Sequence, residues 1–375
     1  MPDRSTVLKS GGDYSGHDFQ GRALRNIDLS RANLRGANLS NTNLKGIDLS
    51  HADLTGAGLY CANLEDAHLQ NANLEGANFE GAHLFKASLV RANLQRARLV
   101  GVNLNSADLR DADLRYADLS SAQLMHSQLS SADLSHSILE QANLRHATLR
   151  QAKLKDSKLK NAVLVHADLN GADLSYAELR GSDLRESTLT GAKLRGAYFT
   201  SCTMERAQLS SVDLTEASLS NAYLRYANLS QAILRNAKLT RVQMSGSNLN
   251  HAELKGANLN GAVLDRSSFK GADLSDARLE SASLLGADLS GARLQGVSMG
   301  RANLVAANLS HANCESIQLG NAVLIAADLR HANFRKAEVS GAKLMLADLS
   351  HAICDNARLP RAYLSDGNLQ DWSLK

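Results

Sequence analysis

The sequence predicts one long repeat solenoid, and three observations lead to that fold class. An apolar residue stands at every fifth position from Phe19 to Leu374, which makes 72 repeats without an insertion or deletion. A helix repeats near 3.6 residues and a strand near 2, so a strict period of five requires the chain to turn once in each repeat. A small residue, usually alanine, comes two positions before most of these apolar residues. Such self-similarity indicates units that bury their apolar residues only by stacking on their neighbours.

The repeat unit is a small residue, then Asp or Asn, then Leu, then two polar or glycine residues. Examples are Ala-Asn-Leu-Arg-Gly at 32–36 and Ala-Asp-Leu-Thr-Gly at 52–56. This pattern resembles the pentapeptide-repeat family, whose motif is A-[DN]-L-x-x, and the resemblance covers nearly all of the chain after Gly11. It implies an all-β fold, a single right-handed quadrilateral β-helix of about 18 coils, in which four repeats make one square coil. The Leu position, which we call the centre, and the residue two before it are then expected to point inward.

We expect a short N-terminal segment at 1–11 and one continuous β-helix over 12–375, because the composition shifts nowhere along the chain. No apolar run is long enough for a membrane span, and residues 1–11 lack the charged-then-apolar plan of a signal peptide. We therefore expect a cytoplasmic protein without membrane contact. Export by a secretion system that reads no signal peptide is the alternative.

The four cysteines and the larger inward residues follow from the same register. Cys61 falls at an outward position, and Cys202, Cys314 and Cys354 fall at inward ones, where we expect them to behave as small hydrophobes. Cys314 and Cys354 share a column two coils apart, about 9.6 Å at strand spacing, which is beyond the reach of a disulfide. Inward positions with larger residues are scattered singly, and Ile27 is the first of them.

The surface is balanced in charge. The chain has 41 Lys and Arg against 38 Asp and Glu, for a formal net charge of +3. Residues twenty positions apart stack in columns, and the most acidic of the four faces nets only −3. That face contains an acidic column: Asp28, Asp48, Asp108, Asp168, Asp288, Asp328 and Asp348. Asp before the centre is also the ordinary repeat motif, which is the simpler interpretation of this column.

This balance bears on the best-known activity that the resemblance implies. Quinolone-resistance members of the family are understood to copy the shape and charge of DNA and so bind DNA gyrase and topoisomerase IV. A duplex carries one negative charge per about 1.7 Å, which this surface does not approach. DNA mimicry toward a topoisomerase is therefore a disfavoured alternative. Direct nucleic-acid binding is not expected either, because basic residues are interleaved with acids and no series of stacking aromatics occurs.

Two columns of histidine stand out at turn positions. One contains His126, His146 and His166, and the other contains His311, His331 and His351. Imidazoles about 4.8 Å apart could share a transition metal or depress one another's protonation. The simpler interpretation is that histidine is one tolerated polar residue among many, so we expect no metal and no cofactor and regard these six as weak candidates. Catalysis is not expected, because the Ser, His and Asp residues all lie on convex faces without a cleft.

The clearest departure from the repeat is apolar. The position after the centre, usually polar, holds Leu285, Val305, Ile325 and Met345 in four successive coils. These residues form a stripe roughly 15 Å long at strand spacing, and contiguous exposed apolar area usually marks an interaction surface. Its flanking residues are Val263, Ala306, Val323, Ala326 and Leu346.

Trp372 is the second departure, because it takes an inward position that is small in most coils. It falls in the final coil, and an open solenoid end normally requires a cap or a partner. Trp372 either closes that end or packs against a second copy, and quinolone-resistance members dimerise through their C-terminal coils.

The sequence therefore predicts a non-enzymatic, rod-like scaffold for protein interaction. The partner is a protein of unknown identity or a second copy, bound through the C-terminal coils at Leu285, Val305, Val323, Ile325, Met345, Leu346 and Trp372. A DNA-mimic modulator of topoisomerases and a bacterial secretion-system effector or adaptor are the alternatives.

Overall fold

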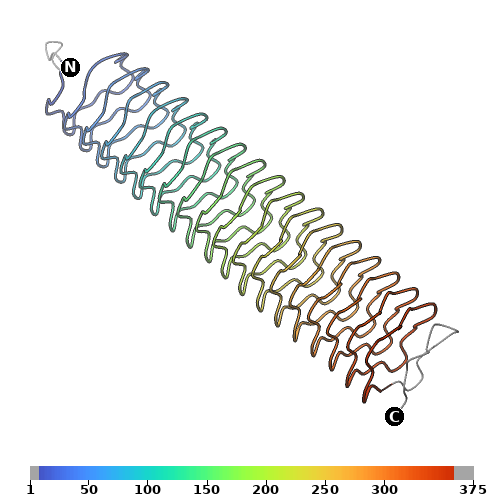
Figure 1. Cartoon of the computed structure of the whole chain (residues 1–375). Helices are drawn as coiled ribbons and strands as arrows, with labels where there is room; N and C mark the ends of the chain where they lie inside the picture. The colour runs from blue at the N-terminus through green and yellow to red at the C-terminus, as the bar shows by residue number, and fades with distance from the viewer. Residues whose placement is uncertain (1–7, 359–375) are drawn as a thin grey trace. The chain divides into compact units, whose positions relative to one another are not determined.

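The structure is a computed structural model, shown in Figure 1, that describes residues 8–358. The chain divides into two compact units, Met1–Asp183 and Leu184–Lys375. Each unit is a stack of similar coils, and successive coils lie directly on one another within it (Figure 1). Trp372 lies outside the described residues, so its predicted role at the end of the solenoid stays a prediction, as does a single uninterrupted β-helix over 12–375.

Within residues 8–358 there is no helix, and no strand is longer than a single bridged residue. The residue before each centre pairs in parallel with the residue twenty positions later. These pairs run from Asp13–Asn33 to Val163–Asp183 in the first unit and from Thr188–Gln208 to Glu338–Arg358 in the second. Four repeats therefore make one coil, as predicted. No helix in this part of the chain could cross a membrane.

Backbone hydrogen bonds fix the register of every repeat. In a typical one, Leu34 N donates to Asp53 O at 2.7 Å and Gly36 N donates to Thr55 O at 2.9 Å, both in the next coil. Ala37 N donates back to Leu34 O at 3.0 Å, which closes a β-turn at the corner of the coil. The third residue of that turn, Gly36, has a φ of 62°, in the left-handed region that glycine adopts without strain.

The Asp or Asn before the centre has a local structural function. Its side-chain oxygen accepts the backbone N–H of the residue after the centre, as between Ser50 N and Asp48 Oδ1 at 2.9 Å. Thr55 N donates in the same way to Asp53 Oδ1 at 3.0 Å. The backbone N–H of the residue after the centre, which could not pair with the next coil, thereby gains a hydrogen bond. This is the physical reason for Asp or Asn at this position.

Leucine centres and the small residues two before them fill the interior of both units. Nearly all of them are buried, and where serine takes the small position it is satisfied locally, as when Ser127 Oγ donates to Leu124 O at 2.7 Å. The first described coil differs. Tyr14 supplies a buried centre one repeat before Phe19, and the rings of Tyr14 and Phe19 meet edge to face with centroids 6.0 Å apart. Ile27, predicted to be inward, is only half-buried in this first coil.

The cysteines follow their predicted positions with one exception. Cys202 and Cys314 are buried, and burial raises the pKa of the Cys314 thiol. Cys61 is partly exposed, as expected of an outward residue. Cys354 was predicted to be buried, but in the last described coil it is only partly so. Its partial burial, and then the charge of Asp355, raise the pKa of its thiol to about 11. All four are free thiols.

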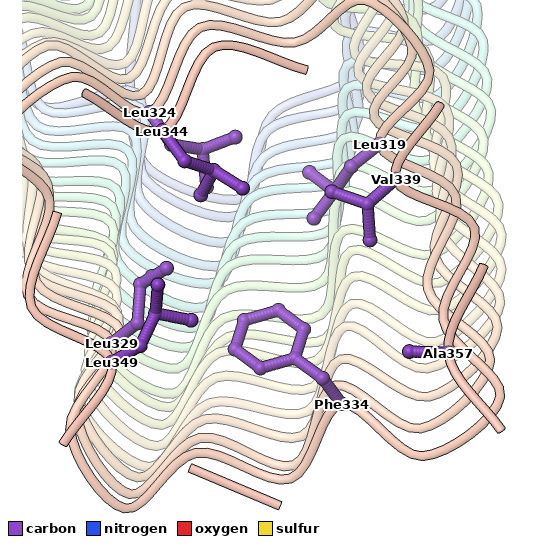
Figure 2. A pocket seen from close by; sticks show the side chains of 8 residues that line it. All are labelled: Leu319, Leu324, Leu329, Phe334, Val339, Leu344, Leu349 and Ala357. Atoms are coloured by element: carbon purple, nitrogen blue, oxygen red, sulfur yellow. The ribbon is translucent and has the colours of Figure 1, made fainter. Parts of the chain in front are cut away.

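The interior of the second unit contains a small apolar cavity near the end of the described chain. Figure 2 shows Phe334 directed into the space between stacked pairs of apolar side chains, such as Leu329 with Leu349 and Leu324 with Leu344. Its volume is only about 10 Å3 and every lining residue is apolar. A space of this size, lined only by apolar side chains, offers no polar group that could hold a water or a substrate.

Candidate interaction surface

The predicted apolar stripe forms one corner of the coils in the second unit. Leu285, Val305, Ile325 and Met345 are the second residues of four successive turns, and the third residues are Gly286, Ala306, Ala326 and Leu346. We call these eight residues the apolar ridge. Hydrogen bonds between turns hold its register, since Ala306 N donates to Ile325 O and Ala326 N donates to Met345 O, both at 2.9 Å.

Three of the large aliphatic side chains of the ridge are exposed to solvent. Leu285 is 37% exposed, Met345 42% and Leu346 73%, while Val305 and Ile325 are half-buried between their neighbours. Among residues 8–358, the exposed large aliphatic side chains are these three and Ile353. Exposed aliphatic surface is therefore concentrated at this one corner rather than scattered over the coils, which is the distribution expected of a contact surface.

The structure brings most of the predicted flanking residues to the ridge. Val323 is half-buried on the flat side of the coil, two residues before Ile325. Val263 lies in the same column, but Ser283 and Asn303 stand between it and Val323, so it is not continuous with the apolar surface. The contiguous surface thus consists of the ridge and Val323.

Leu346 occupies an unfavourable backbone conformation. Its φ of 61° lies in the left-handed region, which costs a branched or bulky residue more than it costs glycine or asparagine. Most equivalent positions hold glycine or a polar residue. Leu346 therefore combines an unfavourable backbone conformation with a largely exposed apolar side chain, and such a combination points to a role in function.

The side of the coil next to the ridge carries the acidic column. Asp328 and Asp348 share one guanidinium, with Arg330 at 2.7 Å from the first and 3.7 Å from the second. The side-chain hydrogen bond from Arg330 lowers the pKa of Asp328, and the hydrogen bonds from Ser350 lower the pKa of Asp348. These carboxylates therefore stay ionised well below neutral pH. Sequence analysis missed Arg330 as their common counterion, although its position two residues after Asp328 could have indicated it.

Both histidine columns form stacked ladders. In the second unit, the ring centroids of His311 and His331 are 4.7 Å apart and those of His331 and His351 are 4.9 Å apart, with planes within 12° of parallel. We call these three the C-terminal ladder. The N-terminal ladder, in the first unit, has the same form: His126, His146 and His166 stack at 4.9 Å. All six are exposed and have φ of 56–62°, so each stands at a turn.

The stacked geometry does not form a metal site. Within residues 8–358 no group of three or more His, Cys, Asp or Glu is arranged to hold a metal ion. Two imidazole nitrogens bound to one zinc ion are at most about 4.2 Å apart, given bonds of 2.0–2.1 Å, and their lone pairs must converge. Parallel rings at 4.7–4.9 Å direct their nitrogens side by side instead.

The first unit contains one stacked column that sequence analysis did not identify. The rings of Tyr116 and His136 are parallel with centroids 5.0 Å apart, and Arg96 lies 5.9 Å from the centroid of Tyr116. His136 Nδ1 is 4.0 Å from Asp156 Oδ2. The twenty-residue spacing of these four residues was the available signal.

Comparison with known proteins decides the family. A model of pentapeptide repeats matches ten stretches of the chain: 18–50, 62–99, 92–127, 127–164, 167–206, 202–241, 243–280, 272–310, 312–350 and 342–374. The chain belongs to the pentapeptide-repeat family. This membership confirms the resemblance seen in the repeat unit and supports a repeat solenoid.

Solved structures of family members match the chain over part or most of its length. HetL, a pentapeptide-repeat protein involved in heterocyst differentiation regulation in Nostoc sp. strain PCC 7120, is 32% identical, covering 70% of this chain and 90% of its own, with a TM-score of 0.24. Rfr23 of the cyanobacterium Cyanothece 51142 is 26% identical, covering 30% and 91%, with a TM-score of 0.30. QnrB1, a plasmid-mediated fluoroquinolone resistance protein, is 20% identical, covering 48% and 90%, with a TM-score of 0.40. No curated protein sequence matches the chain. The family assignment therefore rests on the repeats themselves.

Proposed function

We propose that this protein is a non-enzymatic interaction scaffold, rod-like in form, that associates with a second copy of itself through the apolar ridge. The observation that carries the proposal is the concentration of exposed aliphatic side chains at one corner of the second unit, including the strained and exposed Leu346. Removing such a surface from water is the main favourable contribution to protein association.

The chemistry of the ridge favours a second copy as the occupant. None of its eight residues is charged, so it does not select a partner by opposite charge. A two-fold arrangement lets each ridge cover the other, which is how most soluble oligomers form. The ridge is small beside the roughly 800 Å2 that each partner buries in a standard stable interface. We therefore expect a weak association, with a Kd in the micromolar range.

Several finer features belong to the same proposal. They are a right-handed β-helix of about 18 coils running through both units, a cytoplasmic location in a bacterium, and closure of the C-terminal end by Trp372 or by the second copy. The repeat register, which is continuous over the sequence, supports the first of these. A crystal structure of the full chain would check the handedness, the number of coils and the packing of Trp372 together.

The alternatives retain less support. The hypothesis of DNA mimicry loses support because most carboxylates of the acidic column are neutralised. Five of the seven have a cationic partner within 3.7 Å: Asp108, Asp168, Asp288, Asp328 and Asp348. A bacterial secretion-system effector or adaptor would also need a binding surface. In that case the ridge would bind a different protein, and the chain alone would remain monomeric.

The test is a pair of arginine substitutions in the ridge. Val305→Arg with Ile325→Arg should raise the Kd of self-association at least about tenfold, which is 1.4 kcal/mol, because charges would be buried in an apolar contact. Multi-angle light scattering over a concentration series measures the mass, and circular dichroism checks that the fold is intact. Arginine is compatible with this turn position, since Arg225 occupies it in the same column.

The matched control adds the same two charges at the same turn position outside the ridge, as Ser230→Arg with Ser245→Arg. This variant should associate like the wild type. Unchanged association of the ridge variant would reject the surface. A wild-type chain that stays monomeric at several hundred micromolar would reject self-association as the function.

A further inference from the structure

The second unit has exposed aromatic side chains at a place separate from the apolar ridge. Tyr223 is 46% exposed and Tyr226 is 64% exposed, and both belong to the same side of one coil. Tyr223 stands at the middle of that side, where it pairs with the residues one coil before and one coil after it, and Tyr226 is the third residue of the turn that ends the side. Tyr198 is also exposed, but it lies one coil and one side earlier. The other aromatic residues described in the second unit are buried: Phe199, Phe269 and Phe334.

Tyr226 combines an unfavourable backbone conformation with exposure, as Leu346 does. Its φ of 60° lies in the left-handed region, which costs a bulky residue more than it costs glycine or asparagine. Its ring lies against the backbone of Gly246, the next residue in the same column, where a Cβ would come within 2.7 Å of two ring carbons. The glycine thus makes room for the ring and holds it in place at the surface. An outlier that presents a positioned aromatic ring to solvent points to a role in function.

A guanidinium lies near both phenols. Arg225, the residue before Tyr226, donates two hydrogen bonds to one carboxylate oxygen of Glu205, at 2.6 and 2.9 Å. The pKa of this guanidinium is raised first by Glu205 and, more weakly, by the two phenols, so it lies within electrostatic reach of both. Arg225 therefore stays charged.

Two further arginines flank the tyrosines. Arg206 precedes Tyr226 by one coil in the same column, and its backbone N donates to Arg225 O at 3.0 Å. Arg241 is the third residue of the turn that begins the same side one coil after Tyr223. Within residues 8–358 neither Arg206 nor Arg241 forms an ion pair. We call the two tyrosines and three arginines the tyrosine patch: Arg206, Tyr223, Arg225, Tyr226 and Arg241.

The patch is positively charged, and its surroundings leave that charge in place. Residues 201–206, 221–226 and 241–246 contain three arginines against one glutamate, which is a net charge of +2. The side of the coil that follows Tyr226 has no charged residue at 207–210, 227–230 or 247–250, and Asn248 there donates to Asn228 Oδ1 at 3.2 Å. The preceding side and the following coil each contain one charge of either sign: Glu216 with Lys238, and Asp265 with Arg266.

We propose that the tyrosine patch is a second binding surface of the scaffold, which takes an acidic segment of a partner protein. Tyrosine and arginine are the residues that contribute most often to the centres of protein interfaces. Guanidinium groups bind carboxylates through paired hydrogen bonds, so a patch with a net charge of +2 favours an acidic occupant. The patch lies on one side and one convex corner of the coil, which suits an extended segment better than an enclosed small molecule.

This inference goes beyond self-association and does not depend on it. The ridge begins at Leu285, and the coil with Asp265 and Arg266 separates it from the patch. The ridge is uncharged, whereas the patch is cationic and aromatic, so the two surfaces suit different occupants. A scaffold with both would join a second copy of itself to an acidic partner.

The experiment measures the binding of three fluorescein-labelled heptapeptides to the full-length protein by fluorescence anisotropy. The first is Glu-Glu-Leu-Glu-Leu-Glu-Glu, the second has glutamine in place of each glutamate, and the third has glycine in place of each leucine. The acidic peptide with leucine should bind at least about tenfold more tightly than the glutamine peptide and at least about threefold more tightly than the glycine peptide. Its affinity should fall as sodium chloride rises, because salt screens exposed charges.

Two variants assign the binding to the patch. Tyr223→Ser with Tyr226→Asn removes the rings, and asparagine accepts the positive φ at 226 without strain. Arg206→Gln with Arg241→Gln removes the two arginines that form no ion pair within residues 8–358. Each variant should raise the Kd of the acidic peptide at least about tenfold, while circular dichroism and the urea midpoint show that the fold is intact.

The matched control is Arg91→Gln with Arg301→Gln. Both arginines are third residues of turns, with φ of 56° and 60°, and neither forms an ion pair in the described part of the chain. This variant loses the same charge outside the patch, so its Kd should stay within about twofold of the wild type. An equal loss of binding in the control would show attraction to the net charge of the protein and would overturn the inference.

The position of the Tyr226 ring has its own test. Gly246→Asn should displace the ring and raise the Kd at least about threefold, since asparagine accepts the φ of 68° but its Cβ would collide with the ring. Gly291→Asn is the control, because its φ is 64° and no atom lies within 4 Å of an added Cβ. Unchanged binding by the Gly246 variant would contradict a role for the positioned ring.

The remaining outcomes separate other occupants of the patch. Polygalacturonate and a single strand of 15 thymidines compete with the labelled acidic peptide, and stronger competition by either than by the unlabelled peptide would assign the patch to a polysaccharide or a nucleic acid. Loss of self-association without loss of peptide binding in the tyrosine variant would assign it to the contact between copies. Each of these results would overturn the inference, as would a wild type that does not prefer the acidic peptide. None would reject the ridge, which is tested by Val305→Arg with Ile325→Arg.

Discussion

Leu346 shows most clearly how a single residue can serve a surface rather than the fold. The left-handed conformation at the third position of the turn is set by the hydrogen bonds between coils, whatever residue stands there. Glycine and asparagine accept it at little cost, whereas leucine does not. With 73% of its surface exposed, Leu346 recovers little of this cost by burial within its own chain. A second molecule that covered the side chain would offset this cost.

Leu346→Asn should therefore separate stability from association. Removing the left-handed strain should raise the free energy of unfolding by about 1 kcal/mol. Removing an exposed apolar side chain from the ridge should weaken self-association severalfold. Urea unfolding followed by circular dichroism measures the first effect, and light scattering measures the second. Ala326→Asn, at the same turn position one coil earlier, is the control and should gain less stability. A Leu346→Asn variant less stable than the wild type would contradict this account.

At the residue scale, the sequence predicted which residues share a corner of the coil, but not which side chains form ion pairs. A constant period of five made every column readable, so Leu285, Val305, Ile325 and Met345 could be placed on one corner without coordinates. The partner of a carboxylate depends on side-chain conformation and could not be read in this way. The partial exposure of Ile27 and Cys354 was also missed, because their inward positions belong to the first and last described coils.

At the scale of the structural element, stacking brings the rings of repeated histidines face to face. The spacing of twenty residues predicted the two ladders, but the parallel orientation of their rings is a property of packing at a shared turn. This orientation is unfavourable for metal binding, because parallel rings direct their nitrogens side by side and the nitrogens cannot converge on one ion. The same orientation lets a charge on one ring act on the next. The N-terminal ladder makes this coupling measurable, since it lies in a different unit from the ridge.

His146 is the middle ring of that ladder, and its pKa is lowered first by loss of contact with water, then by His126 and His166, and then by Arg145. The folded state thus binds fewer protons than the unfolded chain, whose histidine pKa is about 6.5. Its contribution to stability is complete above that pH and is lost as the pH falls toward the folded-state value. We expect the urea midpoint of the wild type to fall slightly between pH 7.5 and 5.5.

His146→Asn should reduce this fall, because asparagine does not titrate. The control is His51→Asn, at a turn of similar φ whose column neighbours, Arg31 and Asn71, are not histidine. A fall in the urea midpoint that is identical in wild type and His146→Asn would show that the stacked rings are not coupled in the folded state.

At the scale of the whole molecule, the distribution of charge decides which partners the surface can attract. The formal net charge is +3, and ion pairs neutralise two of the four carboxylates of the acidic column in the first unit and all three in the second. A DNA duplex carries about three negative charges over one strand spacing of 4.8 Å. The carboxylates here are in addition used locally, since their oxygens accept the backbone N–H of the following turn. Neither unit therefore presents a continuous negative field.

The balanced charge of the surface predicts that the protein does not act on DNA gyrase, the alternative partner considered above. The protein at micromolar concentration should leave gyrase supercoiling unchanged, and it should not protect the enzyme from a quinolone. Arg110→Gln with Arg330→Gln removes the cations beside Asp108 and Asp328, which lie at 2.6 and 2.7 Å. If the neutralised charge is what prevents DNA mimicry, this variant should inhibit gyrase supercoiling more than the wild type does, because the acidic column would then carry more of its formal charge. Inhibition or protection by the wild-type protein would show instead that shape suffices without a matching charge, and the ridge would no longer be the surface that defines the function.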